Sequence, residues 1–215
     1  MIDYVWLVPA FPLIGVLLNG LAGIRFPKIL TGFIGSVMIL LSFVVSCLIM
    51  AQVLQTDPGA RVFEVLLYRW IPCGDLQVNI GFLVDALSLI MMLTVSGVSF
   101  VIHVYSVGYM HDDPGFRRYF TYLNLFVFFM LILVSANSFL LMFIGWEGVG
   151  LCSYLLIGFW YQRQAPAAAG KKAFIVNRIG DYGFLLAMML IFVVFGTLDF
   201  LPVFEKAPQF LKSGE

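Results

Sequence analysis

The stretch FLLMFIGWEGVGLCSYLLIGFWY, from Phe139 to Tyr161, carries a single charged side chain, Glu147, near its centre. A membrane-spanning helix needs about 20 predominantly apolar residues, so this stretch predicts a span with Glu147 close to the midplane. An isolated charge at that depth is costly. The carboxyl is therefore protonated, paired or reached by water, and each of these states makes Glu147 a candidate for handling protons or cations.

The composition of the whole chain predicts an integral membrane protein. Hydrophobic residues make up 62% of the 215 residues and charged residues 11%, against about 25% charged in an average soluble domain. The net charge is zero, so there is no basic surplus of the kind that binds nucleic acid. Cys47, Cys73 and Cys152 have no close spacing, which argues against a disulfide framework or a zinc site.

Hydropathy along the chain predicts an all-α protein with six membrane-spanning helices. The expected spans are residues 4–24, 29–54, 82–107, 119–134, 139–161 and 173–195. The N-terminus lacks the positive leader of a signal peptide, so the first span is expected to be retained. Mixed charges and turn residues from Gln55 to Gly81 predict a short extramembrane hairpin or interfacial segment.

The short link between the fourth and fifth spans and the segment after the sixth span each lead to a prediction. Only Ser135 to Ser138 separates the fourth span from the fifth, so those two helices are expected to pack as an antiparallel pair. The polar segment from Gly196 to Glu215 contains Pro202 and Pro208, and no regular element is expected there.

The distribution of Lys and Arg predicts an outward N-terminus, because the short loops on the cytoplasmic side carry the excess of basic residues. With the N-terminus outward, the inward connections hold Arg25, Lys28, Arg117, Arg118, Arg163, Lys171 and Lys172. The outward segments then hold Arg61, Arg69, Lys206 and Lys212.

Arg178 and Asp181 lie three residues apart in the sixth span, on one helix face and close enough to pair. They are expected at about the same depth as Glu147. One interpretation is a buried ion pair that only fixes helix packing. The other is that Arg178 keeps Asp181 ionised and biases the field felt by a mobile proton.

Glu147 has two interpretations as well. A purely structural carboxyl would stay protonated and hydrogen-bonded to a neighbouring helix, whereas an unpaired midplane acid marks an ion or proton pathway by default. Arg178 is the one cation within reach, and Asp181 is expected to claim it. A lysine or histidine on a helix outside these 215 residues is therefore the expected partner. Gly145, Gly148 and Cys152 form a small-residue face that permits close helix packing.

For three further polar residues, the sequence favours a structural role or simple solvent exposure over a role in proton transfer. Asp85 lies near the start of the third span, where acids are favoured at helix N-termini, so an interfacial cap is expected. His103 has no chain of polar neighbours in sequence, which favours hydrogen-bonded packing over a proton relay. His111, in the polar loop HDDPGFRR, is expected to be solvated.

Three blocks of this sequence resemble a known family. They are FLVDALSLIMMLTVSGVSFVIHVYSVGYM at 82–110, FIGWEGVGLCSYLLIGFWY at 143–161 and KKAFIVNRIGDYGFLL at 171–186. Together they are similar to the N-terminal part of subunit L of bacterial NADH:quinone oxidoreductase, respiratory complex I. The resemblance covers nearly the whole chain, and the WEGVGLCSYLLIGFW and NRIGD blocks are specific to that family.

The resemblance implies an antiporter-like, proton-translocating subunit in a bacterial cytoplasmic membrane. Glu147 then corresponds to a carboxylate of the proton path that pairs with a lysine on a later helix. Arg178 and Asp181 correspond to residues near the neighbouring antiporter-like subunit. Enzyme activity would belong to the assembled complex, and the family's later helices are absent here, so these 215 residues alone are expected not to pump.

Cofactors are expected in partner subunits rather than in this chain. The sequence has no glycine-rich dinucleotide loop, phosphate loop or cysteine cluster of the kinds that bind redox and nucleotide groups. Flavin, iron–sulfur clusters and quinone would bind elsewhere in the complex. Two other functions remain open: a subunit of an Mrp-type cation/proton antiporter, and a structural membrane anchor in which Glu147 never ionises.

Overall fold

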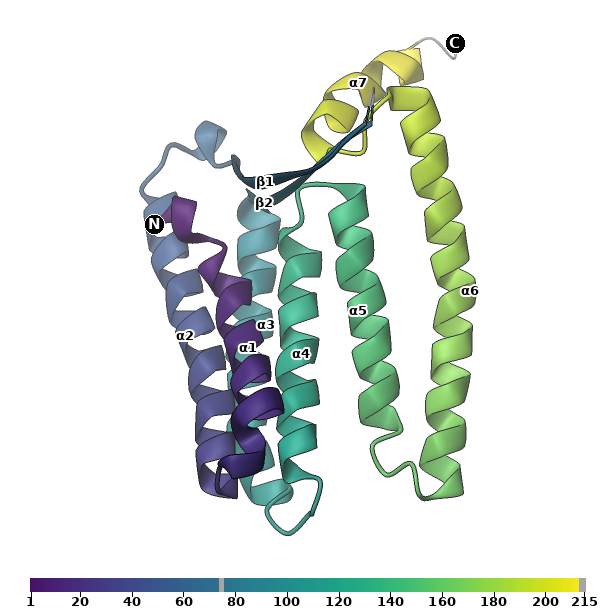
Figure 1. Ribbon diagram of the computed structural model, residues 1–215. Helices are drawn as coiled ribbons and strands as arrows, with labels where there is room; N and C mark the ends of the chain where they lie inside the picture. The colour runs from purple at the N-terminus through teal and green to yellow at the C-terminus, as the bar shows by residue number, and fades with distance from the viewer. Residues whose placement is uncertain (74–75, 213–215) are drawn as a thin grey trace.

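The computed structural model describes residues 1–73 and 76–212, and it is an assembly of long helices capped at one end by a β-hairpin and a short helix (Figure 1). In chain order the elements are the 3₁₀ turn Ile2–Tyr4, α1 Leu7–Leu17, the π-helical turn Leu18–Ala22, the 3₁₀ turn Gly23–Arg25, α2 Lys28–Leu54, the 3₁₀ turn Pro58–Ala60, β1 Phe63–Cys73, β2 Leu76–Val84, α3 Ala86–Tyr109, α4 Phe116–Ser135, α5 Phe139–Ile157, α6 Gln164–Phe195 and α7 Phe200–Lys212.

Within the described residues, six helical segments are long and apolar enough to cross a membrane. They are Ile2–Ala22, which joins α1 to its flanking turns, and helices α2 to α6. The prediction of an all-α membrane protein with six spans is therefore confirmed. The first span is not one regular helix, because Pro12 interrupts the hydrogen-bond pattern of α1 and a π-helical turn follows it.

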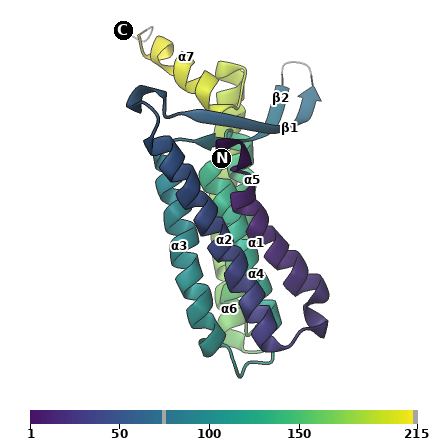
Figure 2. The ribbon, with the colours of Figure 1, turned by 90° about the vertical axis from the view of Figure 1, so that its left-hand side faces the viewer.

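Helices α1 to α4 form a bundle, and α5 and α6 extend from it as a row beside α4 (Figures 1 and 2). The bundle holds the main apolar core, in which Ile39, Leu89, Met92 and Leu131 are fully buried. Among the described elements, α5 is the one that packs extensively against α6. Most side chains of α6 are consequently exposed in this part of the protein.

The expected antiparallel pairing of the fourth and fifth spans is confirmed, since α4 and α5 pack closely along their length. A Cβ atom added at Gly145 would come within 2.6 Å of the Leu133 backbone nitrogen, and one at Gly148 would come within 2.2 Å of the Phe129 ring. Cys152 is fully buried on the same face. These small residues therefore set the α4–α5 distance, as expected from their spacing.

The segment between the second and third spans is an antiparallel hairpin, as predicted, with Phe63 of β1 paired to Val84 of β2. Figure 2 shows the hairpin extending sideways across the end of the bundle. It docks on the α4–α5 turn, because Phe82 forms a bridge with Ala136 and Asn137 donates a 2.8 Å hydrogen bond to Glu64.

Strand β2 runs to Val84, so the third helix begins at Ala86 and not at Phe82 as expected. Hydropathy could not separate these two elements, because an apolar strand leads directly into an apolar helix. Asp85 is the N-cap residue: its carboxylate accepts from the Ser88 backbone at 2.7 Å, and Ser88 Oγ accepts from the Asp85 backbone at 2.8 Å. The expected cap is confirmed.

The largest remaining differences from the predicted boundaries lie at the end of α5 and the start of α6. Helix α5 ends at Ile157 and not Tyr161, and α6 begins at Gln164 and not Ala173. Hydropathy finds the apolar part of a helix, whereas QAPAAAGKK at the start of α6 combines good helix formers with polar residues. A helix extending beyond the apolar segment is invisible to that signal.

The prediction that no regular element follows Gly196 is wrong, because α7 occupies Phe200–Lys212. Gly196 ends α6 with a φ of 72°, a conformation that glycine adopts without strain. The chain then turns back, and Phe139 donates its backbone N–H to Leu198. Pro202 lies in the first turn of α7, where no helical hydrogen bond is lost, so it does not prevent the helix.

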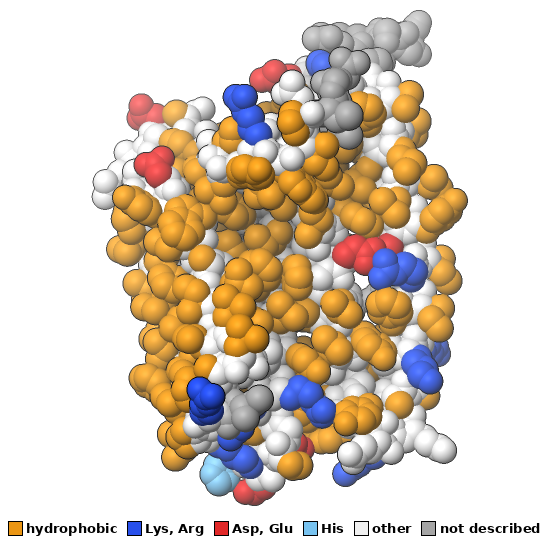
Figure 3. Space-filling view, viewed as in Figure 1, with side chains coloured by type: hydrophobic (Ala, Val, Ile, Leu, Met, Phe, Trp, Pro, Cys, Tyr) orange, Lys and Arg blue, Asp and Glu red, His pale blue; other side chains and the backbone are white. Residues whose placement is uncertain are grey.

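Basic side chains gather at the end of the bundle opposite the hairpin (Figure 3). That end contains the turn before α2, the first turns of α2, α4 and α6, and the α5–α6 loop, and these segments carry the seven residues assigned inward. The N-terminus, the hairpin and α7 share the other end (Figure 1). This separation agrees with the lysine and arginine count, and the outward N-terminus stays a prediction because the structure holds no bilayer.

Two parts of the sequence analysis extend beyond the described side chains. Cys47 and Cys152 are free cysteines, whereas the side chain of Cys73 lies outside the described part. The side chain of Lys212, counted among the outward basic residues, lies outside it too.

Candidate functional site

The charged residues of the fifth and sixth spans meet between α5 and α6, about halfway along the bundle. Arg178 Nη1 donates to Glu147 Oε1 at 2.7 Å. Arg178 Nε lies 3.8 Å from Asp181 Oδ2 on the next turn of the same helix. Figure 3 shows adjacent acidic and basic side chains over these two helices. One guanidinium group therefore serves two carboxylates.

The expected pairing scheme is thus wrong in one respect. Asp181 was expected to claim Arg178 and leave Glu147 without a cation in this chain, but the shorter contact is to Glu147. An arginine fork has several N–H donors in one plane, so it can reach a carboxylate on another helix and one on its own helix together. Spacing along the chain reveals only the second of these contacts.

Trp146 is the site residue that sequence reasoning missed. Its indole Nε1 donates a 2.8 Å hydrogen bond to Asp181 Oδ1, and its ring packs against Phe184 of α6 with centroids 6.4 Å apart. A tryptophan in an apolar span needs an acceptor for its N–H group. That requirement, together with its position beside Glu147 on the helix that faces α6, was the available signal.

The three charged side chains differ in exposure. The side chain of Asp181 is 6% exposed, that of Glu147 is 23% exposed and that of Arg178 is 52% exposed. Asp181 is therefore enclosed by α5 and α6, whereas the Glu147–Arg178 pair lies at an open face. The Arg178 guanidinium also lies over the Phe174 ring, 4.9 Å from its centroid, a favourable position for a cation.

A cavity of about 370 Å³ lies at this open face. Glu147 and Arg178 are its charged lining residues, and the remainder of the lining is apolar, including Phe129, Phe143 and Leu151. Apolar walls keep the local polarity low, so charges inside interact strongly with each other and with any ion that enters. The arrangement suits uptake and release of a proton or small cation at Glu147.

The two histidines lie elsewhere. His103 is fully buried in the bundle, where its Nδ1 is 2.7 Å from the Ser99 carbonyl oxygen and its ring meets Phe120 edge to face. The expected hydrogen-bonded packing role is confirmed. His111 is exposed in the α3–α4 loop beside Asp112, as expected.

Two family models match this chain. Residues 70–120 match the N-terminal model of chain 5 of NADH-ubiquinone oxidoreductase (complex I). Residues 136–214, which contain Glu147, Arg178 and Asp181, match the membrane domain shared by NADH:quinone oxidoreductase and Mrp antiporters. The chain belongs to the subunit L family of NADH-quinone oxidoreductase.

Individual relatives agree with this assignment. Subunit L of NADH-quinone oxidoreductase from Mycobacterium tuberculosis is 46% identical over 205 residues, which are 95% of this chain and 32% of the relative. The Neisseria meningitidis subunit L is 41% identical over 94% of this chain and 30% of the relative. Chain 5 of NADH-ubiquinone oxidoreductase from Chondrus crispus is 41% identical over 95% of this chain. The chain spans about a third of the length of these subunit L relatives.

A solved structure supports the fold. A chain of an archaeal respiratory complex, the membrane-bound sulfane sulfur reductase, superimposes with a TM-score of 0.79 over 92% of this chain and 38% of that chain. Sequence identity is 19%, so this likeness concerns the fold alone. The subunit L family and that respiratory complex thus share this arrangement of helices.

Proposed function

We propose that this chain is the N-terminal part of a proton-translocating membrane subunit of an NADH:quinone oxidoreductase. The observation that carries the proposal is the 2.7 Å contact of Arg178 with Glu147 while the same guanidinium also faces Asp181. Two ionised carboxylates and one guanidinium leave one negative charge within a membrane span. Because such a charge is costly in hydrocarbon, the site needs one proton or one further cation.

The geometry supports a sequence of steps for that proton. When Glu147 is ionised, Arg178 holds it across the α5–α6 interface. When Glu147 takes up a proton, its attraction for Arg178 falls, and the guanidinium shifts toward Asp181 on its own helix. Trp146 keeps Asp181 in place throughout by its hydrogen bond. The two acids therefore take up protons as a coupled pair.

Release of the proton requires a second positive charge near the open cavity beside Glu147. The family resemblance supplies a candidate: a lysine on a later helix, beyond these 215 residues. A lysine that approaches favours the ionised carboxylate, and one that retreats favours the protonated form. Redox chemistry elsewhere in the complex would drive this movement, because transfer of one charge against 100 mV costs about 2.3 kcal/mol.

The remaining parts of the proposal concern the assembly. The chain would lie in a bacterial cytoplasmic membrane as a multi-pass subunit and contact a neighbouring antiporter-like subunit near Arg178 and Asp181. Flavin, iron–sulfur clusters and quinone would bind to partner subunits, so enzyme activity belongs to the complex. The apolar composition and six spans support the membrane location, and the family match supports the assembly.

The test is Glu147→Gln in the full-length subunit within its assembled complex. Glutamine keeps the shape of the side chain but cannot ionise, so NADH-driven proton uptake by inverted membrane vesicles should fall at least fivefold. NADH oxidation with an artificial acceptor should stay within a factor of two. Glu205→Gln on exposed α7 makes the same chemical change outside the spans and should leave both rates unchanged. Full proton transport in the Glu147→Gln vesicles would disprove the proposal.

A cation/proton antiporter subunit is the second candidate, because the model matching residues 136–214 is shared with Mrp antiporters. Sodium or potassium gradients would then drive proton movement in vesicles without NADH, and Glu147→Gln would abolish it. A purely structural anchor is the third. Infrared titration of the Glu147 carboxyl separates it from the other two, since an anchor requires a carboxyl that stays protonated at every pH.

A further inference from the structure

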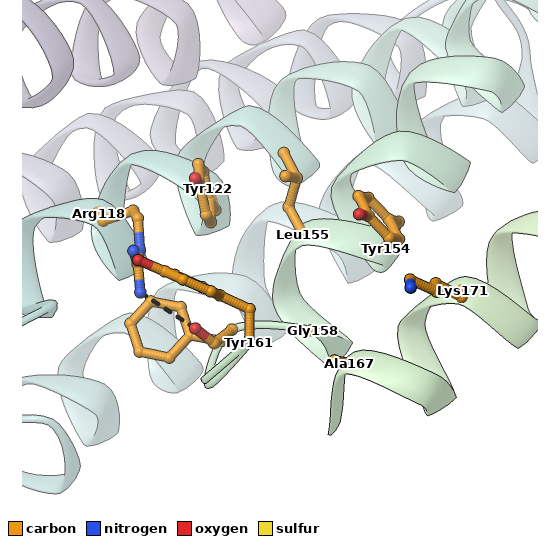
Figure 4. A pocket seen from close by; sticks show the side chains of 9 residues that line it. Arg118, Tyr122, Tyr154, Leu155, Gly158, Tyr161, Ala167 and Lys171 are labelled. Carbon is orange, nitrogen blue, oxygen red and sulfur yellow. Dashed lines mark hydrogen bonds between the residues drawn. The ribbon is translucent and has the colours of Figure 1, made fainter. Parts of the chain in front are cut away.

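A second cavity lies at the basic end of the spans, away from the Glu147 site. It has a volume of about 350 Å³ and is enclosed by the start of α4, the end of α5 and the start of α6. Figure 4 shows Arg118 and Tyr122 on the α4 side, Lys171 on the α6 side and Tyr154 of α5 between them. Two cations from different helices thus line one cavity.

The Arg118 guanidinium is held firmly in this cavity wall. Its Nη2 donates to the Phe159 carbonyl oxygen at 3.0 Å, and its Cζ atom lies 4.7 Å from the Phe159 ring centroid and 5.1 Å from that of Tyr161. Figure 4 shows the Tyr161 ring lying alongside the guanidinium. A planar cation held between a carbonyl and two rings is oriented in advance for an anion.

Within the described part of the chain, the lining of this cavity contains two cations and no acid. Neither Arg118 nor Lys171 forms an ion pair among the described residues. Asp113 lines an adjacent cavity with Arg118 and is the acid nearest to this site. Hydrogen bonds from Trp160 Nε1 at 2.9 Å and the Gly115 backbone at 2.6 Å lower its pKa, and so does the Arg118 charge. Asp113 thus balances part of the Arg118 charge from outside the cavity, whereas Lys171 has no acid beside it among the described residues. The cavity is therefore a site of net positive charge.

Its position indicates what kind of anion enters. Gly158 and Gly170 bring the end of α5 and the start of α6 together, since a Cβ at Gly170 would be 3.3 Å from Gly158 Cα. The cavity consequently sits where the apolar spans end and where Lys and Arg gather (Figure 3). Tyrosine and tryptophan are favoured at this headgroup level of a membrane, and basic pockets between helices there bind acidic lipid headgroups.

We propose that this cavity binds the phosphate group of an anionic phospholipid. Arg118 presents its fork, Lys171 adds a point charge from the opposite wall, and Tyr122, Tyr154 and Tyr161 offer hydroxyl donors to the phosphate oxygens. Leu155 and Ala167 supply apolar lining beside the polar groups. A lipid matches both parts of this lining, whereas free phosphate matches only the first. The proposal is independent of proton transport at Glu147.

The test measures lipid retained by the complex that contains the full-length subunit. The complex is purified in mild detergent, stripped of loosely bound lipid and titrated with phosphatidylglycerol, with bound lipid counted by native mass spectrometry. The double variant Arg118→Gln/Lys171→Gln should bind phosphatidylglycerol at least tenfold more weakly than the wild type at one site. Lys172→Gln/Arg25→Gln removes two basic residues from the same end but outside the cavity, and it should bind as the wild type does.

Two further binding measurements distinguish an anionic phospholipid from other occupants of the cavity. Phosphatidylcholine should not fill the site, and glycerol phosphate or inorganic phosphate at millimolar concentration should not displace phosphatidylglycerol. Displacement by either soluble anion would overturn the lipid assignment in favour of a free phosphate site. Equal phosphatidylglycerol binding by wild type and double variant, or none by the wild type because a protein segment fills the cavity, would overturn it as well.

Arg118→Gln also removes the hydrogen bond to Phe159, so the double variant could fail through loss of fold. Lys171→Gln alone avoids this, because Lys171 is exposed and makes no described polar contact. It should weaken phosphatidylglycerol binding at least threefold with an unchanged midpoint of thermal unfolding in lipid-free detergent. An unchanged affinity for phosphatidylglycerol in this variant would contradict the proposal.

Discussion

The chemistry of this chain depends on a few polar contacts within apolar helices. Arg178 bridges Glu147 on α5 and Asp181 on α6, and Trp146 supplies a neutral donor to Asp181. Each of these three charged side chains has at least one polar partner, as is usual for polar groups where water is scarce. Changes that remove one partner should therefore affect stability and proton transport together.

Trp146→Phe tests the role of the indole donor. Phenylalanine keeps an aromatic ring against Phe184 but removes the hydrogen bond to Asp181, which leaves a buried carboxylate oxygen unpaired. We expect a loss of about 1–3 kcal/mol in stability and reduced proton transport. Trp160→Phe is the matched control, since it removes a hydrogen bond to Asp113 in an exposed loop. Thermal unfolding in detergent would show equal midpoints for the two variants if the buried contact were unimportant.

Arg178→Lys tests the need for a forked cation. Lysine keeps the positive charge but cannot direct parallel N–H groups at two carboxylates. We expect proton transport in vesicles to fall severalfold, and to fall further in Arg178→Gln, where both acids lose their cation. Wild-type transport in Arg178→Lys would show that charge alone suffices and that the two-acid contact is incidental.

At the scale of helices, close packing of small residues places Glu147. Helix α5 lies against α4 through Gly145 and Gly148, and this contact orients the opposite side of α5 toward α6. Capping fixes where the helices begin: Ser138 Oγ accepts from the Leu141 backbone at the start of α5, and Asp85 does the same for α3. The site geometry therefore depends on residues that never touch it.

Gly145→Ala should disturb that packing. Its Cβ would meet the Leu133 backbone at 2.6 Å, and backbone cannot move aside as a side chain can. We expect a loss of about 1–3 kcal/mol from overpacking, despite the better helix propensity of alanine. Gly108→Ala in α3 is the control, because nothing lies within 4 Å of its added Cβ. A Gly145→Ala variant as stable as Gly108→Ala would show that α4 and α5 separate at no cost.

At the scale of the whole molecule, one end is closed by segments distant in sequence. Glu64 of β1, Asn79 of β2, Asn137 of the α4–α5 turn and Asp199 before α7 lie together there. Ser138 and Asp199 also form an isolated β-bridge. The hairpin, the α4–α5 turn and α7 are thus tied into one surface, which steadies the ends of α5 and α6.

Burial raises the pKa of Asp199, and the nearby Glu64 charge raises it further. A hydrogen bond from Asn79 lowers the pKa but does not cancel this rise. A raised pKa in the folded state means that Asp199 stabilises the fold below its unfolded pKa. This stabilisation is lost as the pH rises through the higher folded value. Asp199→Asn should therefore raise the unfolding midpoint at pH 7.5 and change it little at pH 4. If the difference in unfolding midpoint between the wild type and Asp199→Asn were the same at pH 4 and at pH 7.5, the raised pKa of Asp199 would be contradicted.

Much of the architecture followed from sequence because lipid imposes simple rules. Apolar runs of sufficient length predict spans, and the WEGVG and NRIGD blocks located Glu147, Arg178 and Asp181 on adjacent helices. The start of α3, the early start of α6 and the existence of α7 did not follow. Each depends on where backbone hydrogen bonds are satisfied, and average hydropathy does not report that.

The sequence by itself determined that this chain is a membrane protein with six apolar spans and that Glu147, Arg178 and Asp181 lie deep within two of them, because the cost of polar groups in hydrocarbon acts locally along the chain. Only the tertiary structure decided that Arg178 reaches across to Glu147, that Trp146 holds Asp181, and that Arg118 and Lys171 face one cavity. These contacts join different helices, and their distances depend on packing angles that glycines and turns set together.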